Sequence, residues 1–330
     1  MLTYLIPILY IILISILLKN RNVFIIFLFL IPIIMFSTYR GTMGADTSNY
    51  IKMFNDFNDF DSEFSFLNEP FFYILLFISK KISSNIEFFF FLNSTLVTFL
   101  YSLLISKFSL SRIFLLSVGP VFLIDTLTNG MRIGISYQIL ALGLILNTKN
   151  KRLTVLASLF HISSLFYFFY NRFINPIIEK INKKNFVLFL LCILMAPFVI
   201  VLVMNNQRIL DKIVYYSSFQ SPSILSGASD IYVILVVSLL SINRKCHIST
   251  YFTKLLTLAI IIITFKIAAI YSYAILRLMK LMVLSTIVYS SKVKSKSKLL
   301  DNNKFLFFSL LVPYTTNFIL YIYRNPELYL

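Results

Sequence analysis

The chain is built from uncharged or nearly uncharged apolar runs of roughly 15 to 20 residues, which recur along its whole length between short basic clusters. Each run is long enough for a tilted helix to cross about 30 Å of hydrocarbon. The pattern predicts an all-α, polytopic integral membrane protein with about ten to twelve transmembrane helices. It leaves no soluble domain, so residues 1–330 are expected to form a single transmembrane domain.

The predicted spans follow one another along the chain. They cover residues 2–18, 23–38, 86–106, 113–128, 133–148, 153–170, 186–204, 230–242, 250–268, 272–289 and 305–323. One further apolar piece is too short to span comfortably. We therefore expect a helix over 70–83 that lies on or dips into the outer interface, with Pro70 in its first turn. Lys80 and Lys81 would snorkel there. A second broken or re-entrant segment is expected between 153 and 180.

Composition agrees with this class. Hydrophobic residues make up 58% of the 330 residues, with 35 Phe, 20 Tyr and a mean hydropathy of +0.85, whereas soluble domains contain roughly 45–50% apolar residues. The formal net charge of +17 does not indicate a nucleic-acid partner, because Lys and Arg fall in short clusters without a soluble scaffold. The two cysteines, Cys192 and Cys246, indicate neither a disulfide framework nor a cysteine metal site.

The basic clusters predict which ends of the helices face the cytoplasm, because cytoplasmic loops carry an excess of Lys and Arg. The strongest cluster is SKVKSKSK at 291–298, and KNKR at 149–152 follows the same rule. Alternation of the spans then places two long loops outside, at 39–69 and at 205–229.

The first external loop has the residues of a site rather than of a tether. Residues 37–72 contain six of the thirteen acidic residues. Arg40, Asp46 and Tyr50 bring a cation, a carboxylate and an aromatic ring into one short stretch, and two glycines free the backbone between them. The alternative is that Arg40 only marks the end of a span and that Asp46 only caps the helix that follows it.

A second group of polar residues borders the outer end of a predicted span. Ionisable groups in such places are costly and usually face a cavity or a partner. Asp125, Asn129 and Arg132 stand at i, i+4 and i+7, so they share one helical face if Gly130 does not break the helix. The alternative is that Asp125 and Arg132 only neutralise each other.

Two further polar groups lie within apolar runs. His161, followed by Ser163 and Ser164, is either a buried hydrogen-bonded residue or a functional one, and no partner stands at metal-ligand spacing. Arg277 and Lys280 are about one helical turn apart near the outer end of their span. Two cations on one face suit a phosphate ligand, and snorkelling is the alternative.

Several familiar motifs are missing from the sequence. It contains no G-x-x-x-x-G-K-[ST] nucleotide loop, no H-E-x-x-H and no G-x-S-x-G. Primary ATP-driven transport and metalloprotease activity are therefore not expected. The sequence demands no metal and no other cofactor.

Four motifs occur in a fixed order along the chain. They are Arg40-Gly41 with Gly44-x-Asp46-Thr47-x-x-Tyr50, then Glu69-Pro70-Phe71, Asn129-Gly130-x-Arg132 and His161-x-Ser163. In this order they resemble the EpsG/Wzy-like family of bacterial polysaccharide polymerases. The resemblance covers residues 39–165 well and continues mainly through hydrophobicity and Arg277. One departure is Phe72, because a glycine commonly follows the Glu-Pro pair of the family.

The resemblance implies a GT-C-like membrane glycosyltransferase. Such an enzyme joins polyprenyl-pyrophosphate-linked oligosaccharide repeat units on the outer face of the bacterial cytoplasmic (inner) membrane. Its partners would be the lipid-linked oligosaccharide and the lipid bilayer, with a flippase and a chain-length regulator beside it.

The resemblance and the residue types together suggest roles for ten residues. The expected catalytic residues are Asp46, Glu69, Arg132 and His161, and the expected substrate-binding residues are Arg40, Thr47, Tyr50, Asn129, Arg277 and Lys280. Arg40, Arg132 and Arg277 would hold the pyrophosphate and stabilise its charge as it leaves. Asp46 or Glu69 would take the proton from the acceptor hydroxyl.

Three other activities stay open. A flippase for lipid-linked oligosaccharide would need cations spread through a central cavity rather than concentrated outside. A membrane acyltransferase would use His161 as its general base, deep in the protein and with Arg132 near it. An O-antigen-ligase-like transferase would share the donor and differ only in the acceptor.

The charge clusters generate a prediction about sidedness. We expect the loops 39–69 and 205–229 to face outside and residues 291–303 to face the cytoplasm. In intact cells, a membrane-impermeant thiol reagent should label Ser48→Cys and should reach Ser297→Cys only after the membrane is opened. Equal labelling of both cysteines from outside would contradict the predicted topology.

Overall fold

The computed structural model describes residues 2–18, 22–57, 69–107, 118–145, 151–165, 227–241, 259–260, 263, 266, 278–284, 286 and 304–324. These residues form helices and no strand, which confirms the predicted all-α class for the described part of the chain. The chain divides into two compact units, Met1–Leu165 with Ile287–Leu330, and Phe166–Thr286.

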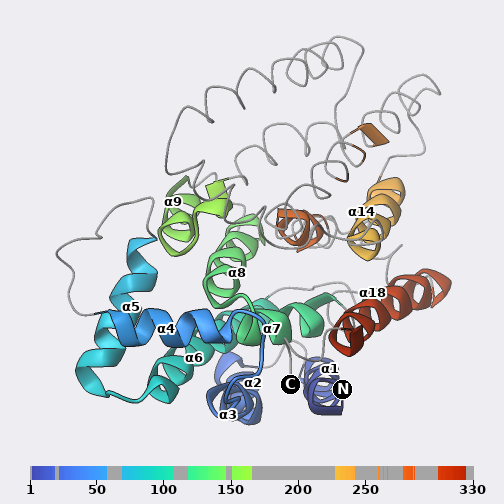
Figure 1. Cartoon of the computed structure of the whole chain (residues 1–330). Coiled ribbons are helices and arrows are strands. Elements are labelled where there is room, and N and C mark those ends of the chain that lie inside the picture. The colour runs from blue at the N-terminus through green and yellow to red at the C-terminus, as the bar shows by residue number, and fades with distance from the viewer. Residues whose placement is uncertain are drawn as a thin grey trace. The chain divides into compact units, whose positions relative to one another are not determined.

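The first unit contains most of the described helices (Figure 1). They are α1 (Leu2–Leu17), α2 (Val23–Phe29), α3 (Ile31–Thr38), α4 (Thr47–Asp56), α5 (Pro70–Ile82), α6 (Ile86–Lys107), α7 (Gly119–Thr128), α8 (Met131–Ile145), α9 (Lys151–Phe160), the 3-10 helix η4 (Ile162–Leu165) and α18 (Lys304–Arg324). In the second unit, the longest described helix is α14 (Ala228–Ser241).

The apolar run predicted over 23–38 forms two helices, α2 and α3, which meet at Leu30. Pro32 explains the break. Proline lacks an N–H and its ring clashes with the carbonyl four residues earlier, so it suits the first turn of a helix and kinks or breaks a helix elsewhere. The chain accordingly starts a new helix at Ile31, which puts Pro32 in the first turn of α3.

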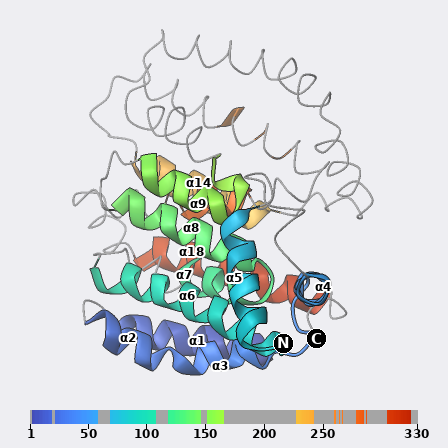
Figure 2. The same ribbon diagram turned by 90° about the vertical axis from the view of Figure 1, so that its left-hand side faces the viewer.

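The helices of the first unit lie in layers (Figure 2). Helices α2 and α3 pack on one side of α6, and α1 packs against α7. Helix α8 packs on α6 and α7, and α9 packs on α8. Helix α5 runs steeply across these layers and contacts both α6 and α9. It therefore links the loop region around α4 to the end of α9.

Helices α7 and α8 form the buried centre of this unit. Every residue of α7 is buried, and α8 buries polar residues such as Ser136 and Gln138 along with its apolar ones. A helix end in such surroundings cannot find water, so its last carbonyl groups need donors from the protein. The end of α7 is therefore the place where the structure requires specific partners.

The loop between α3 and α4 supplies these partners, together with the residues that flank it. The Leu127 carbonyl accepts hydrogen bonds from Ser37 Oγ, at 3.1 Å, and from the Arg40 guanidinium. The Thr128 carbonyl accepts a hydrogen bond from Thr47 Oγ1 at 3.3 Å. A cation at this end also suits the negative end of the helix dipole. The loop is thus docked on the end of α7.

Gly44 permits this docking. Its φ is +106°, and a Cβ at this position would lie 2.4 Å from the Thr128 carbonyl oxygen and 2.9 Å from Thr47 Oγ1. Only a residue without a side chain can approach the end of α7 so closely.

Lys80 holds α4 against α5, which corrects the expectation that it snorkels. Its ammonium donates to the carbonyl oxygens of Phe54 and Asn55, each at 2.9 Å, and to that of Phe57. These carbonyls lie at the C-terminal end of α4, where the last carbonyl groups of a helix lack N–H donors from the helix itself. A cation at this position also complements the helix dipole.

The described residues test only some of the predicted membrane spans. Within them, the helix over Ile86–Ser106 is the one long and apolar enough to cross a bilayer, and Thr3–Leu17, Gly119–Thr128 and Ala228–Val237 are shorter apolar helices. The predicted span at 186–204 lies outside the described residues. So do residues 205–226 of the second predicted loop, most of the spans at 250–268 and 272–289, and most of the broken segment expected between 153 and 180.

Gly44 and Gly41 provide a matched pair that tests the docking of the loop. Both have positive φ, but a Cβ at Gly41 would meet nothing within 4 Å. We expect Gly41→Ala to cost roughly 1 kcal/mol of stability from backbone strain, and Gly44→Ala at least about twice that, because the clash is added. Thermal unfolding of both variants in detergent checks this. Equal losses would show that the close approach to Thr128 does not matter.

Candidate functional site

Glu69 is held in a strained backbone conformation directly before α5. Its φ and ψ are 61° and 62°, in the left-handed region, and Pro70 follows in the first turn of the helix. Among the described residues, it is the one non-glycine residue with positive φ. Such strain costs about 1 to 3 kcal/mol and persists only where the surroundings impose it. Strained residues cluster at functional sites, so Glu69 marks a candidate site.

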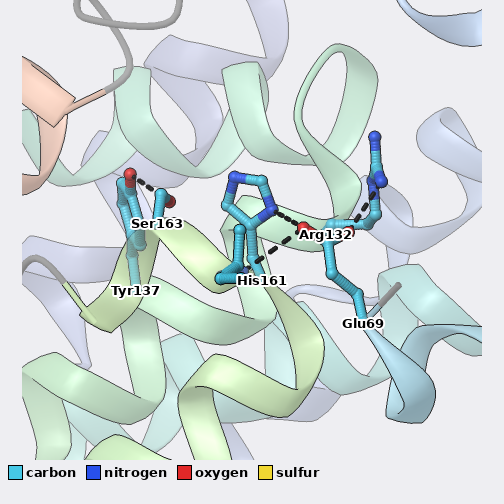
Figure 3. A network of polar contacts seen from close by, with 6 residues as sticks. Glu69, Arg132, Tyr137, His161 and Ser163 are labelled. Carbon is cyan, nitrogen blue, oxygen red and sulfur yellow. Dashed lines mark hydrogen bonds and ion pairs between the residues drawn. The ribbon is translucent and has the colours of Figure 1, made fainter. Parts of the chain in front are cut away.

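The Glu69 carboxylate joins two other parts of the fold (Figure 3). Its Oε2 accepts a hydrogen bond from Arg132 of α8 at 2.6 Å. Its Oε1 pairs with Nδ1 of His161 and accepts a bond from the backbone N–H of Ile162 at 3.3 Å. The Glu69 side chain is only 5% exposed, so this carboxylate is a buried junction with all of its donors supplied by the protein.

These contacts decide the ionisation of Glu69. Burial by itself would raise the pKa of this carboxyl. The hydrogen bond with His161, the positive charge that His161 carries when it is protonated, the charge of Arg132 and the Ile162 N–H together outweigh burial and lower the pKa to about 2. The carboxylate is therefore ionised at neutral pH, and it is a weak proton acceptor.

Arg132 lies in the first turn of α8, after a break in the helix. The sequence aligns Asp125, Asn129 and Arg132 on one helical face only if Gly130 does not break the helix. The helix is broken there, since α7 ends at Thr128 and α8 begins at Met131, which agrees with the turn expected between the spans 113–128 and 133–148. The physical reason is the docked loop. The carbonyls of the last residues of α7 accept bonds from that loop and its flanks, so they do not accept the N–H groups that would continue the helix.

The structure also shows which carboxylate pairs with Arg132. The alternative in which Arg132 neutralises Asp125 is not supported, because the guanidinium forms its ion pair with Glu69. The Asp125 carboxylate instead accepts a hydrogen bond from Asn129 Nδ2 at 2.9 Å. Asn129 Oδ1 in turn accepts a bond from the Ala45 N–H at 2.8 Å, which attaches the loop to the break.

Arg132 is the most accessible member of the Glu69 cluster. Its side chain is 29% exposed, compared with 12% for His161 and 5% for Glu69. Its guanidinium carbon lies 6.0 Å from the ring centre of Tyr50 and 5.5 Å from that of Phe72. Both rings are buried, so they hold the guanidinium from the protein side. A guanidinium has five N–H donors, so the bond to Glu69 leaves Arg132 able to bind an anion.

His161 stands at the end of α9, where the helix changes into η4. Its backbone N–H still bonds to the Ala157 carbonyl at 3.1 Å, and its ring reaches Glu69. Phe160 packs edge-on against Phe71, with ring centres 5.4 Å apart, and this contact fixes the end of α9 against the start of α5. The aromatic contact and the polar contact therefore position His161 together.

Among the other residues predicted in the first loop, Tyr50 lies against Arg132, whereas Arg40 and Thr47 bind the end of α7. Asp46 occupies the N-cap position of α4, as predicted, but its side chain makes no capping hydrogen bond. The partners of Glu69 are Arg132, His161 and Ile162, so Asp46 does not bind this carboxylate.

Arg40 is inside the protein rather than at its surface. It is 2% exposed, its guanidinium lies 4.0 Å from the centre of the Phe90 ring, and one of its nitrogens is 3.2 Å from the Met131 sulfur. Burial lowers its pKa to about 10, so it remains charged at neutral pH. Thr47, with no exposed surface, bonds to the Met43 carbonyl at 2.6 Å. The predicted contacts of both residues with substrate stay predictions.

The structure does not test the two cations predicted near residue 280. Arg277 lies outside the described residues. Lys280 lies in the described segment 278–284 of the second unit and is partly exposed. Their suggested role in phosphate binding therefore stays a prediction.

Sequence reasoning missed three contributors to the site. Lys80 caps α4, Ser37 binds the end of α7, and the backbone N–H of Ile162 completes the shell of Glu69. These contacts join residues between 23 and 93 positions apart, and backbone donors leave no mark in a sequence. In the described part of the chain, no three His, Cys, Asp or Glu side chains form a group that could hold a metal ion.

The family comparison covers nearly the whole chain. The model described as the EpsG family matches residues 22–330. No curated protein and no solved structure matches the chain.

The lowered pKa of Glu69 predicts a specific loss of stability in acid. Its contribution is fully present above the ordinary glutamate pKa of about 4.3 and disappears as the pH falls through about 2, a change of about 3 kcal/mol. The difference in melting temperature between the wild type and Glu69→Gln should therefore shrink over this range. The exposed Asp56→Asn is the control and should show no such trend. A pH-independent difference for Glu69→Gln would contradict the assigned ionisation.

Proposed function

Because the chain belongs to the EpsG family, we propose that it is an integral membrane glycosyltransferase. In this proposal it joins polyprenyl-pyrophosphate-linked oligosaccharide repeat units on the outer face of the bacterial cytoplasmic membrane. Membership of the family supports a polysaccharide polymerase-like role in general. The observation that carries the finer proposal is the cluster of Arg132, Glu69 and His161, which brings a cation and an imidazole to one buried carboxylate.

The chemistry needs a cation at the leaving group. When an acceptor hydroxyl attacks the anomeric carbon of the donor, the bond from that carbon to the pyrophosphate oxygen breaks and negative charge collects on the pyrophosphate. Arg132 suits this charge because a guanidinium binds phosphate oxygens in a two-pronged geometry. Glu69, Tyr50 and Phe72 hold the guanidinium in place before the substrate arrives.

The exposed surface of the N-terminal helices supports a place in the bilayer. Helices α1, α2 and α3 contain no charged residue. Large apolar side chains stand exposed along them, namely Ile6, Leu9, Leu13, Ile16, Leu17, Phe24, Ile25, Leu28, Phe29, Ile31 and Met35. So many exposed large apolar side chains without a charge among them are unusual on a protein surrounded by water, and lipid tails are a fitting neighbour for them. A flippase that delivers the donor and a regulator of chain length would act beside the enzyme.

A membrane acyltransferase is the second candidate. It requires His161 deep in the protein with Arg132 near it, and both residues bind the same carboxylate while His161 is mostly buried. The family match favours the polymerase.

Analysis of surface polysaccharide in a deletion strain separates these candidates. Removal of a polymerase should leave material capped with a single repeat unit. Removal of an acyltransferase should leave full-length chains without an acyl group, whereas a ligase or a flippase should leave no attached polysaccharide. Either of the last two results would overturn the proposal.

Arg132→Lys tests the role of the guanidinium in that strain. Lysine keeps the charge beside Glu69 but cannot make a planar two-pronged contact, so we expect polymer formation to fall by about 10²-fold or more. The protein level should stay that of the wild type. Lys52→Gln, an exposed change on α4, is the control and should restore long chains. Long chains at the wild-type level with Arg132→Lys would remove Arg132 from the proposed binding of pyrophosphate.

A further inference from the structure

The contact between His161 and Glu69 fixes which ring nitrogen carries hydrogen. Nδ1 faces Glu69 Oε1, and the same oxygen accepts the Ile162 N–H. An ionised carboxylate can only accept hydrogen bonds, so the hydrogen must sit on Nδ1. In a neutral ring the second nitrogen, Nε2, then carries the lone pair.

Nε2 is directed away from the carboxylate. In Figure 3 the ring nitrogen that is not bonded to Glu69 points to the side of the ring opposite that carboxylate. The His161 side chain is 12% exposed, so part of it reaches beyond the protein interior, whereas Glu69 is more deeply covered. The imidazole therefore turns its basic nitrogen away from the group that orients it.

Glu69 is poorly placed to take a proton itself. Its two oxygens already receive donors from Arg132, His161 and Ile162. Protonation would weaken its contacts with His161 and Arg132, and these contacts are what lowers the pKa of the carboxyl. Glu69 suits the task of holding its neighbours in place.

We infer that His161 is the general base of the proposed transfer and that Glu69 is the positioning residue that sets its tautomer. Nε2 takes the proton from the acceptor hydroxyl as that oxygen forms its bond to the anomeric carbon. The electron pair of the broken bond leaves with the pyrophosphate. The inference rests on the proposed function, and it replaces the earlier expectation that Asp46 or Glu69 receives the proton.

One carboxylate positions both the general base and the cation that binds the leaving group. Oε1 orients the imidazole and Oε2 orients the guanidinium of Arg132. The proton acceptor and the cation for the leaving group are thus fixed relative to one another. When His161 gains a proton, the negative charge of Glu69 stabilises the imidazolium that forms.

His161→Asn isolates the basic nitrogen. The asparagine amide nitrogen replaces Nδ1 and can keep the bond to Glu69, while nothing replaces Nε2. We expect kcat to fall by about 10² to 10⁴, with KM for the donor within about threefold of the wild type and an unchanged melting temperature. His161→Gln is the second variant and should lose kcat to the same extent. Ser158→Ala is the control on the same helix, because its hydroxyl bonds only to the Val155 carbonyl among the described residues, and it should keep its activity.

The substrate for this assay is the lipid-linked repeat unit that a deletion strain accumulates. The full chain in detergent converts it to oligomers with release of polyprenyl pyrophosphate. If the wild-type chain forms no oligomers, the proposed function fails. If the wild type is active and His161→Asn retains kcat within about threefold, the inference alone fails. It fails equally if the loss appears in KM with kcat retained, or if Asp46→Asn rather than His161→Asn carries the loss of kcat.

A double-mutant cycle separates positioning from simple support of the fold. Glu69→Gln keeps an oxygen that accepts from Nδ1 but removes the charge, so its kcat should fall by less than that of His161→Asn. If Glu69 acts through His161, then Glu69→Gln should lower kcat by a smaller factor in the His161→Asn background than in the wild type, and the loss that remains is the part that acts through Arg132. Multiplied losses in the double variant would show that Glu69 does not act through the imidazole and would overturn its assigned role.

Discussion

A single buried carboxylate connects the parts of this site. Glu69 is almost fully covered and is ionised, and an isolated buried charge of this kind would cost several kcal/mol. Arg132, His161 and the Ile162 N–H offset that cost, and they come from two different helical elements. The same contacts hold the backbone of Glu69 in a left-handed conformation. Removing any partner would therefore disturb charge, backbone and packing together.

The position of Arg132 depends in turn on the break between α7 and α8. The loop after α3 and the residues that flank it satisfy the last carbonyls of α7 through Ser37, Arg40 and Thr47. This allows a new helix to begin with Arg132 in its first turn. Arg40 thereby supports the position of Arg132, although its own hydrogen bond goes to the Leu127 carbonyl. Its buried charge sits at the negative end of α7, where a cation is favourable. The loop therefore helps to fix where α8 begins, and with it the position of Arg132.

The sequence was sufficient to predict the class and the key residues of the cluster. Long apolar runs predicted helices, and the motifs around Glu69, Arg132 and His161 predicted three residues that the structure brings together. The pairing could not be predicted, because Asp125 and Arg132 stand at helical spacing while Glu69 and His161 are 92 positions apart. Spacing reveals neighbours on one helix but not contacts between helices. The apolar pattern predicts the turn between the spans 113–128 and 133–148, but it does not reveal the donors that the distant loop supplies there.

The most direct test of this account is an experimental structure of the full chain with its lipid-linked repeat unit bound. The account predicts that the donor pyrophosphate lies within hydrogen-bond distance of the Arg132 guanidinium, that Glu69 still bridges Arg132 and His161, and that Nε2 of His161 faces the acceptor hydroxyl. A pyrophosphate bound away from Arg132, or a His161 ring that turns Nε2 toward Glu69, would contradict it.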